Sequence, residues 1–291
     1  MTSVGAAHAD NLAMISLPHI YRRRNDHESM YYTWFSLMHT RVDIAFVSEL
    51  DEQTLGGIAE DIYRRVDGIE RMASCFRDDS ELSAINRRAA LGPMSLSAEM
   101  EHILGMCIRY NRLTDGLFDV TASATRSQKR EEAAIQTDSL GISRPSDGTI
   151  AFCRRDIYIN LSGFLKGYAL EQIRPILAAH GIRHALVNMG NSSIMAIGNM
   201  HDGHGWPVAF GADNPRTVTL SDQCLTTSGN DTPERRHIID PRTSQLVTGR
   251  RAIAVVNNDA TEGEVLSTAL FVSTDTPFTG FKPYRIVSDI Y

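Results

Sequence analysis

The sequence predicts an α+β fold in which mixed sheets pack against helices. Three observations support this prediction. Two long segments have apolar residues at every third or fourth position, which indicates amphipathic helices. Several short β-rich segments follow without the regular strand–helix alternation of a doubly wound parallel sheet. The chain has 291 residues, of which 42% are hydrophobic, so it can form a large core without disulfides or metals to stabilise it.

The first third of the chain contains a predicted arm, a β-rich segment and a helix. Residues 1–30 lack periodicity and are interpreted as a loosely ordered N-terminal arm. Residues 31–47 combine partial apolar alternation with aromatic and β-branched side chains, which predicts strands. From Glu52 to about Ala73 an apolar stripe predicts an amphipathic helix.

The middle of the chain contains a second predicted helix and a polar excursion. Ser97 is a suitable N-cap, and Glu99 and Glu101 fall in the first turn. Negative charges there interact favourably with the positive end of the helix dipole. Residues 123–147 are polar and end in turn-forming residues, so we expect a surface excursion there. Residues 155–160 are predicted to form a strand.

The C-terminal half is predicted to contain two helices and several strands. A helix is expected over residues 162–180, with Gly181 closing it and Pro175 kinking or dividing it. No composition break marks a linker, so residues 31–291 are predicted to form a single domain. The remaining predicted elements are a helix at 262–272 and strands at 185–189, 193–197, 208–210 and 252–257.

Composition and charge exclude several classes of protein. Lys and Arg number 29 against 35 Asp and Glu, a net charge of −6, so we expect no nucleic-acid partner. The four cysteines lie far apart without metal-site spacing and are interpreted as reduced thiols. We find neither an apolar run long enough for membrane insertion nor a convincing secretion signal, and therefore expect a cytoplasmic protein.

Lys166 lies in the first informative segment, NLSGFLKGY at residues 160–168. This segment joins a predicted strand to the start of a predicted helix. Free amides at a helix start attract anions, and a lysine adds a charge that can meet a phosphate. An exposed lysine beside a tight junction is the structural alternative.

The second segment joins TTSGN at residues 226–230 with HIIDPRT at residues 237–243. Hydroxyl groups, a turn-forming glycine and the pair His237 and Asp240 could supply hydrogen bonds and a proton carrier. An ordinary turn, in which Asp240 bonds its own backbone, is the alternative.

The third segment, TEGEVLST at residues 261–268, places Glu264 and Thr268 four residues apart. On a helix they would face the same way and could present oxygens to a hard cation. Thr261 and Glu264 also fit a capping box, in which the glutamate only bonds the helix start.

Together and in this order, eight segments resemble the ApbE-type flavin transferases, a family that moves FMN from FAD onto a Ser or Thr of a target protein. The resemblance extends from about Met38 to Ser273 and implies that residues 31–291 form one ApbE-like domain. The segments are MHT (38–40), SCFRDDSELSAIN (74–86), DGLFDVTAS (115–123), INLSGFLKGYAL (159–170), ALVNMGNSSIMAIG (185–198), TTSGN (226–230), HIIDPRT (237–243) and ATEGEVLSTALFV (260–272).

This resemblance implies a set of site residues and an activity. The activity is magnesium-dependent transfer of FMN from FAD to a target protein, with AMP released. Lys166 is expected to stabilise charge at the phosphates, and His237 to take the proton of the acceptor hydroxyl. Magnesium is expected on a backbone carbonyl of Gly163 and on Glu264 and Thr268. FAD contacts are expected from Met38, Phe76, Leu117, Phe118, Asp119, Asn160, Lys166, Ser228 and Ile238.

The chain also departs from the family pattern, which keeps two other functions open. With water as acceptor, the protein would be an FAD pyrophosphatase that releases FMN and AMP. Without chemistry, it would be a degenerate paralogue that binds flavin or another nucleotide. The departures are His39, Asn191 and Ser244 in place of glycine, Val120 in place of proline, and Asn160 and Glu264 in place of aspartate.

Overall fold

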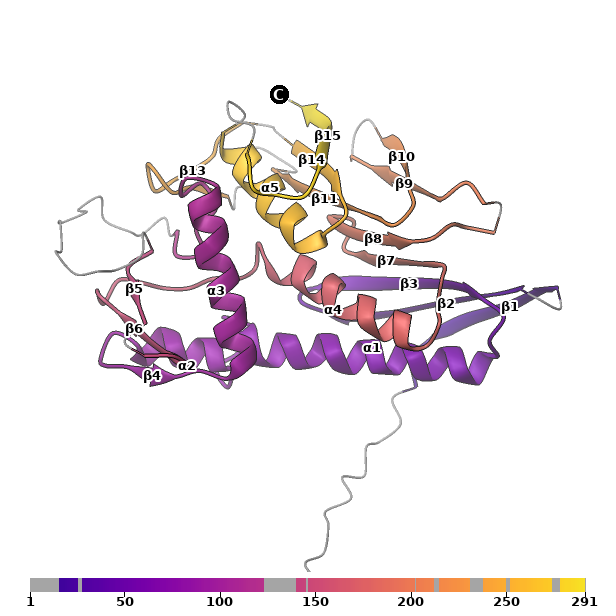
Figure 1. Cartoon of the computed structure of the whole chain (residues 1–291), viewed down its shortest axis with the longest axis horizontal. Coiled ribbons are helices and arrows are strands. Elements are labelled where there is room, and N and C mark those ends of the chain that lie inside the picture. Colours follow the sequence, from indigo (N-terminus) through magenta and orange to yellow (C-terminus); the bar gives the residue numbers. More distant parts are fainter. Residues whose placement is uncertain are drawn as a thin grey trace, which may run out of the picture.

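A computed structural model describes residues 16–25, 28–122, 140–144, 146–201, 203–211, 215–230, 238–249, 252–273 and 278–290. Its centre is one eight-stranded sheet in the order β1-β2-β3-β7-β8-β11-β14-β15, in which neighbouring strands pair antiparallel (Figure 1). The strands are β1 (His19–Asn25), β2 (Glu28–Leu37), β3 (Thr40–Ser48), β7 (Ala185–Met189), β8 (Ser193–Ile197), β11 (Gln223–Gly229), β14 (Ala252–Asn257) and β15 (Tyr284–Ile290).

Helices cover one face of this sheet. The long helix α1 runs beneath β2 and β3, whereas α5 lies over β11 and β14, and α4 packs between α1 and α5 (Figure 1). Residues such as Phe46, Val187 and Val255 point to this side and join the main hydrophobic core. The helices are α1 (Glu52–Ala73), α2 (Glu81–Arg88), α3 (Ala98–Leu113), α4 (Leu165–Ala179) and α5 (Ala260–Val272).

The opposite face of the sheet carries a second, smaller core. Side chains that alternate with the first set, such as Ile194, Leu225 and Val256, pack there against Trp206 and Leu220. This core lies under the hairpin of β9 (Trp206–Phe210) and β10 (Arg216–Leu220). The other short strands are β4 (Met94–Ser95), β5 (Ile142–Ser143), β6 (Thr149–Phe152), β12 (Ile239–Asp240) and β13 (Gln245–Leu246).

Side-chain caps define the helices whose starts were predicted well. The Asp51 carboxylate accepts a hydrogen bond from the Thr54 amide at 2.8 Å, and α1 begins at the next residue. The Ser97 hydroxyl accepts one from the Met100 amide at 3.2 Å and caps α3. The helix at 162–180 is confirmed but begins three residues later, because Leu161–Phe164 forms a turn without a side-chain cap. Pro175 lies inside α4 and does not divide it.

Two predictions about strands are wrong. The segment 19–30, interpreted as part of an arm, contributes β1 and the start of β2 to the sheet. Since β1 is almost fully exposed, it shows no apolar alternation to predict it. Residues 155–160 form no strand, because the Asn86 side chain, instead of a neighbouring strand, bonds both the amide and the carbonyl of Ile159.

Three residues at positions where the resemblance places glycine keep a left-handed backbone. The φ angle is +56° at His39, +60° at Asn191 and +58° at Ser244. A side chain is strained in this region, although asparagine tolerates it better than most residues. The chain therefore retains the turns that glycine would form and bears some strain at His39 and Ser244.

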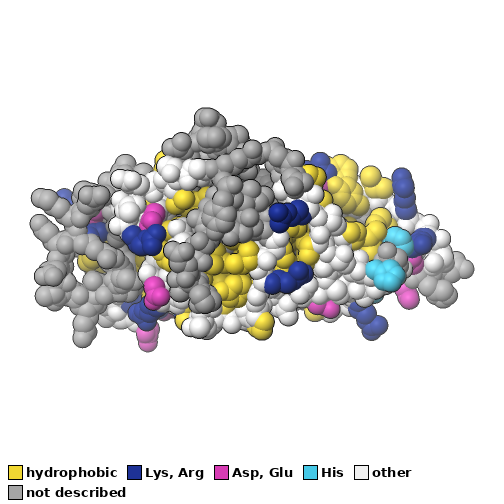
Figure 2. All heavy atoms as spheres, turned by 90° about the horizontal axis from the view of Figure 1, so that it is seen from above, with side chains coloured by type: hydrophobic (Ala, Val, Ile, Leu, Met, Phe, Trp, Pro, Cys, Tyr) yellow, Lys and Arg dark blue, Asp and Glu magenta, His cyan; other side chains and the backbone are white. Residues whose placement is uncertain are grey.

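The surface is mixed in character. On the face seen in Figure 2, the described Lys and Arg side chains lie in small separate groups beside hydrophobic side chains. None of the helices within the described residues is long and apolar enough to cross a membrane. All four cysteines are free thiols, as predicted.

Candidate functional site

The start of α4 is held in place by side-chain contacts to neighbouring loops. The Asn160 amide donates to the Val120 carbonyl at 2.8 Å, which joins this junction to the loop that follows α3. The Asn160 side-chain oxygen accepts from the Ser162 amide at 2.9 Å and from its hydroxyl at 2.6 Å. Asn160 thus shapes its own turn, and its side chain is exposed at the mouth of the junction.

A line of polar contacts runs from α4 to α5 through the start of β8. The Lys166 ammonium donates to the Ser192 hydroxyl, and the Ser193 hydroxyl donates to the Glu264 carboxylate. The two serine oxygens are 3.4 Å apart. Burial raises the pKa of Glu264, whereas the charge of Lys166 and the Ser193 hydrogen bond act in the opposite direction. The structure therefore joins two predicted site residues through two serines that were not predicted as site residues.

Helices α4 and α5 approach each other closely enough to bring the predicted cation ligands together. A Cβ atom placed on Gly163 would lie 3.9 Å from the Thr268 hydroxyl. Gly163 lies in the turn before α4; four residues later, inside α4, a Cβ on Gly167 would lie only 2.6 Å from Cγ of Glu264. One turn beyond that, the Glu171 carboxylate accepts the Ala260 amide at 2.8 Å. Each step of four residues from Gly163 into α4 thus meets a step of four residues back along α5.

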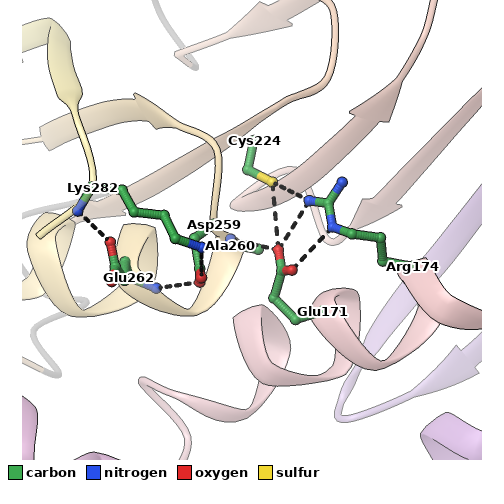
Figure 3. A network of polar contacts seen from close by, with 7 residues as sticks. All are labelled: Glu171, Arg174, Cys224, Asp259, Ala260, Glu262 and Lys282. Carbon is green, nitrogen blue, oxygen red and sulfur yellow. Dashed lines mark hydrogen bonds and ion pairs between the residues drawn. The ribbon is translucent and has the colours of Figure 1, made fainter.

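The contact between Glu171 and Ala260 belongs to a polar network that joins α4 and α5 at a distance from the predicted ligands (Figure 3). Glu171 pairs with Arg174 at 3.0 Å on the same helix. The Cys224 thiol of β11 lies 4.0 Å from the Glu171 carboxylate and 3.7 Å from the Arg174 guanidinium. Burial raises the pKa of Cys224 to about 12, so the thiol is protonated and structural.

The capping-box alternative for Glu264 is wrong. The N-cap of α5 is Asp259, whose carboxylate accepts the Glu262 amide at 3.0 Å and pairs with Lys282 at 2.8 Å (Figure 3). Thr261 is buried within the first turn. Glu264 lies one turn further along, and its carboxylate points to Ser193 instead of the helix start.

The three predicted cation ligands pass a test of donor chemistry. Carboxylate, hydroxyl and carbonyl oxygens are the hard donors that magnesium prefers. Glu264 is 4% exposed, and the Ser193 hydroxyl donates the only hydrogen bond that its carboxylate receives from described residues. Thr268 is held by the Ser228 hydroxyl at 3.3 Å, and Ser228 also contacts Ser267 at 2.9 Å. Gly163 is an exposed residue, and a Cβ placed on it would lie 3.9 Å from the Thr268 hydroxyl.

The residues predicted to lie against the flavin ring form a second group around the β2–β3 hairpin. Phe76 is 65% exposed and meets the His39 ring edge-on at 5.1 Å between centroids. The Met38 amide donates to the Glu70 carboxylate at 2.9 Å, which holds the hairpin on α1. An open hollow beside this hairpin is lined by Ser36, Leu37, His39, Thr40, Arg41 and Glu70.

The hairpin is packed against the turn that carries Ser192. A Cβ on Gly190 would lie 2.1 Å from the Thr40 hydroxyl, and the Gly190 amide donates to the Arg41 carbonyl at 3.0 Å. The flavin-side group and Lys166 are therefore linked through the turn between β7 and β8. Tyr158 gives a second link, since its hydroxyl donates to the Cys75 carbonyl next to Phe76 at 3.2 Å.

Leu117, Phe118 and Asp119 follow α3 and lie mainly inside the protein. Leu117 is 7% exposed and Phe118 3% exposed, and the Phe118 ring packs near Phe164 with centroids 6.3 Å apart. The Asp119 carboxylate accepts the Thr121 amide and hydroxyl, both at 2.7 Å. These residues therefore support the loop beside Asn160, and only Asp119 is partly exposed.

The second sequence segment divides into a strand and a turn. Residues 226–229 belong to β11, so Gly229 does not form a turn. The Asp240 carboxylate accepts the Arg242 amide at 2.9 Å, which confirms the ordinary-turn interpretation of Asp240. Ile238 is buried, and its carbonyl accepts the Val247 amide at 2.9 Å. His237 lies outside the described residues.

Comparison with known proteins identifies the family. The ApbE family model matches residues 38–277. The FAD:protein FMN transferase of Vibrio cholerae is 24% identical over 267 residues, which cover 81% of this chain and 79% of that protein. The enzyme of the same name from Haemophilus influenzae is 25% identical over 267 residues, covering 78% and 76%.

Solved structures share the same fold. The flavin transferase ApbE from Vibrio cholerae matches with a TM-score of 0.71 at 23% identity and covers 84% of this chain and 87% of that one. The Pseudomonas stutzeri flavinyl transferase ApbE, in its apo form, matches with a TM-score of 0.71 at 18% identity, covering 84% and 85%. The α+β prediction and the resemblance are confirmed, and the chain belongs to the ApbE family.

Proposed function

We propose that this protein transfers FMN from FAD to a Ser or Thr hydroxyl of a target protein, with magnesium bound at Gly163, Glu264 and Thr268. The observation that carries the proposal is the polar line from Lys166 through two serines to Glu264. This line places an ammonium group and a buried carboxylate around one small region between α4 and β8. Relatives named FAD:protein FMN transferase support the same activity.

The reaction exchanges the phosphoanhydride bond of FAD for a phosphate ester bond to the acceptor. The acceptor oxygen forms a bond to the FMN-side phosphorus while the pyrophosphate bond breaks, and AMP leaves with the bridging oxygen. The acceptor proton passes to a base, for which we propose His237. Magnesium, when bound, would offset negative charge that develops on the phosphate oxygens.

We propose that different side chains of the site bind different parts of FAD. Lys166 would hold the diphosphate through its ammonium group. Phe76 offers an exposed aromatic face for the flavin ring. We propose further FAD contacts from Met38 and Asp119, and from Asn160 at the mouth of the junction. The remaining proposed FAD contacts are Leu117, Phe118, Ser228 and Ile238. All four of these residues are buried in the structure.

The activity is tested by mass spectrometry of an acceptor. The purified protein is incubated with FAD, Mg²⁺ and a small protein that carries an exposed Ser/Thr acceptor segment. The proposal predicts an acceptor heavier by one FMN group and an equal amount of AMP. Free FMN with AMP would instead identify a pyrophosphatase, and unchanged FAD would identify a non-catalytic binder; either result contradicts the proposal.

Lys166 provides a direct variant test of the phosphate assignment. We expect Lys166→Ala to lower kcat by about 10²- to 10³-fold, as the loss of one transition-state donor does in other enzymes. The matched control is Lys282→Ala, because Lys282 is paired with Asp259 at the start of α5 and has no place in the proposed chemistry. Equal activity of both variants and the unmodified protein would remove Lys166 from the mechanism.

A further inference from the structure

Ser193 has an unusual position for a hydroxyl residue. It is the first residue of β8 and is completely buried, under α5, with Met189 and Thr226 as its neighbours on the adjacent strands. A buried hydroxyl costs free energy unless it is hydrogen-bonded. Its partner is the Glu264 carboxylate, which is itself buried. The Ser193 hydroxyl is therefore satisfied inside the protein, and one oxygen of the Glu264 carboxylate is engaged.

Contacts at both ends fix the path of the Glu264 side chain. Near its base, Cγ runs directly over Gly167, where even a Cβ atom would come within 2.6 Å. At its tip, one carboxylate oxygen accepts the Ser193 hydrogen bond. With the side chain fixed at base and tip, the second oxygen has a defined direction. A carboxylate held in this way loses less rotamer freedom when it binds a cation.

The adjacent serine explains why Glu264 stays separate from Lys166. The two charges attract each other across this buried region, and a direct ion pair would engage both groups. The Ser192 hydroxyl instead accepts a hydrogen bond from the Lys166 ammonium, and the Ser193 hydroxyl donates one to the Glu264 carboxylate. Each charged group thus has a hydroxyl partner of its own, and the two are not engaged in an ion pair with each other.

We infer that Ser193 is a positioning residue that orients the Glu264 carboxylate for a divalent cation. This inference rests on the cation site of the proposed function and adds a residue to it. Asp, the shorter residue that the resemblance places here, would end one methylene earlier, so we expect it to lose the hydrogen bond from Ser193. The serine therefore compensates for the longer side chain of this chain's glutamate.

The test measures cation affinity without FAD and without turnover. Mn²⁺ serves as the probe, and the signal of the free ion in electron paramagnetic resonance gives its dissociation constant. We expect Ser193→Ala to weaken Mn²⁺ binding by about 10- to 100-fold, the range found when partners of metal-ligating side chains are removed. Ser193→Cys keeps the shape of the side chain with a slightly larger atom and replaces the strong donor with a weak one, so it should also weaken Mn²⁺ binding. It provides the test if the alanine variant does not fold.

Thr226→Val is the matched control. Thr226 lies beside Ser193 on the neighbouring strand and is equally buried, but its hydroxyl has no hydrogen-bond partner among the described residues. Removing this hydroxyl should leave the Mn²⁺ dissociation constant within about twofold, a change of about 0.4 kcal/mol or less. Melting temperatures of all variants show whether each one is folded.

Glu264→Asp completes the design. In that background Ser193→Ala should change Mn²⁺ affinity little, because the shorter carboxylate no longer receives the serine hydrogen bond. If the unmodified protein binds Mn²⁺ and Ser193→Ala binds it equally well, the inference is wrong while the cation site stands. If the unmodified protein binds no Mn²⁺, both the inference and the cation site of the proposed function are wrong.

Discussion

The close approach of α4 and α5 at Gly167 makes a quantitative prediction about stability. A Cβ atom at this position would lie 2.3 Å from the Ala260 carbonyl oxygen and 2.6 Å from Cγ of Glu264. Both distances are below 3.0 Å, and Cβ atoms in proteins essentially never come that close to another atom. Because the first contact is to backbone, Gly167→Ala must push the two helices apart.

The expected cost follows from two opposing effects. Overpacking a core costs about 1–3 kcal/mol, whereas replacing glycine by alanine inside a helix gains up to about 1 kcal/mol. We therefore expect Gly167→Ala to lower the free energy of unfolding by about 1–2 kcal/mol. With a urea slope of about 3 kcal/mol per M, the unfolding midpoint should fall by about 0.3–0.7 M.

The control is Gly57→Ala on α1. Gly57 also lies inside a helix, but a Cβ there would meet no atom within 4 Å. This variant should gain up to about 1 kcal/mol from helix propensity and raise the urea midpoint. If Gly167→Ala were as stable as Gly57→Ala, the helices would not be in the contact described, and the placement of Glu264 against α4 would lose its basis.

Two further predictions concern other parts of the fold. Arg65 donates to Glu99 at 2.5 and 3.0 Å and lowers the pKa of that carboxyl, so the pair should stabilise the protein above pH 4.5 and lose this effect as the pH falls through the lowered pKa. Glu99→Gln should therefore cost up to about 1 kcal/mol at pH 7 in urea unfolding, and a difference that did not shrink as the pH fell below 4.5 would contradict this cause. Ser244→Gly should raise the free energy of unfolding by about 1 kcal/mol, because φ is +58° there, whereas Ser244→Ala, which retains Cβ, should bring no such gain.

The sequence predicted the elements whose local signals agree with their packing. Helix α1 has an N-cap, an apolar stripe and one buried face, and its predicted bounds are confirmed. The strands at 185–189, 193–197 and 252–257 were predicted with the bounds that the structure shows. They lie in the centre of the sheet, where nearly every residue is at least partly buried and hydrophobic patterning is strong.

Elements held mainly by backbone pairing could not be predicted in the same way. Strand β1 is exposed along almost its whole length, so only its hydrogen bonds to β2 place it in the sheet. Helix α2 was not predicted, although Ser80 caps it with an ordinary N-cap hydrogen bond to the Ser83 amide at 2.9 Å. It has only eight residues, too few for a clear periodic pattern.

In the candidate site, too, residues with a clear sequence signal were predicted and residues without one were not. Lys166, Glu264 and Thr268 were selected because charge and spacing are visible in the sequence. Ser192 and Ser193 were missed as site residues, since two serines at the start of a strand resemble any polar turn. A signal did exist in the sequence: Ser193 begins a predicted strand whose next three residues are apolar, and a polar side chain in such a strand needs a hydrogen-bond partner if it is buried.

The central claim is that one region beside Lys166 and Glu264 binds both the diphosphate of FAD and a divalent cation. A crystal structure of the protein grown with FAD and Mg²⁺ measures this directly. We predict that the diphosphate contacts the Lys166 ammonium and that the ion is coordinated by Glu264 and Thr268. FAD bound elsewhere on the molecule, or an ion that contacts neither side chain, would contradict the claim.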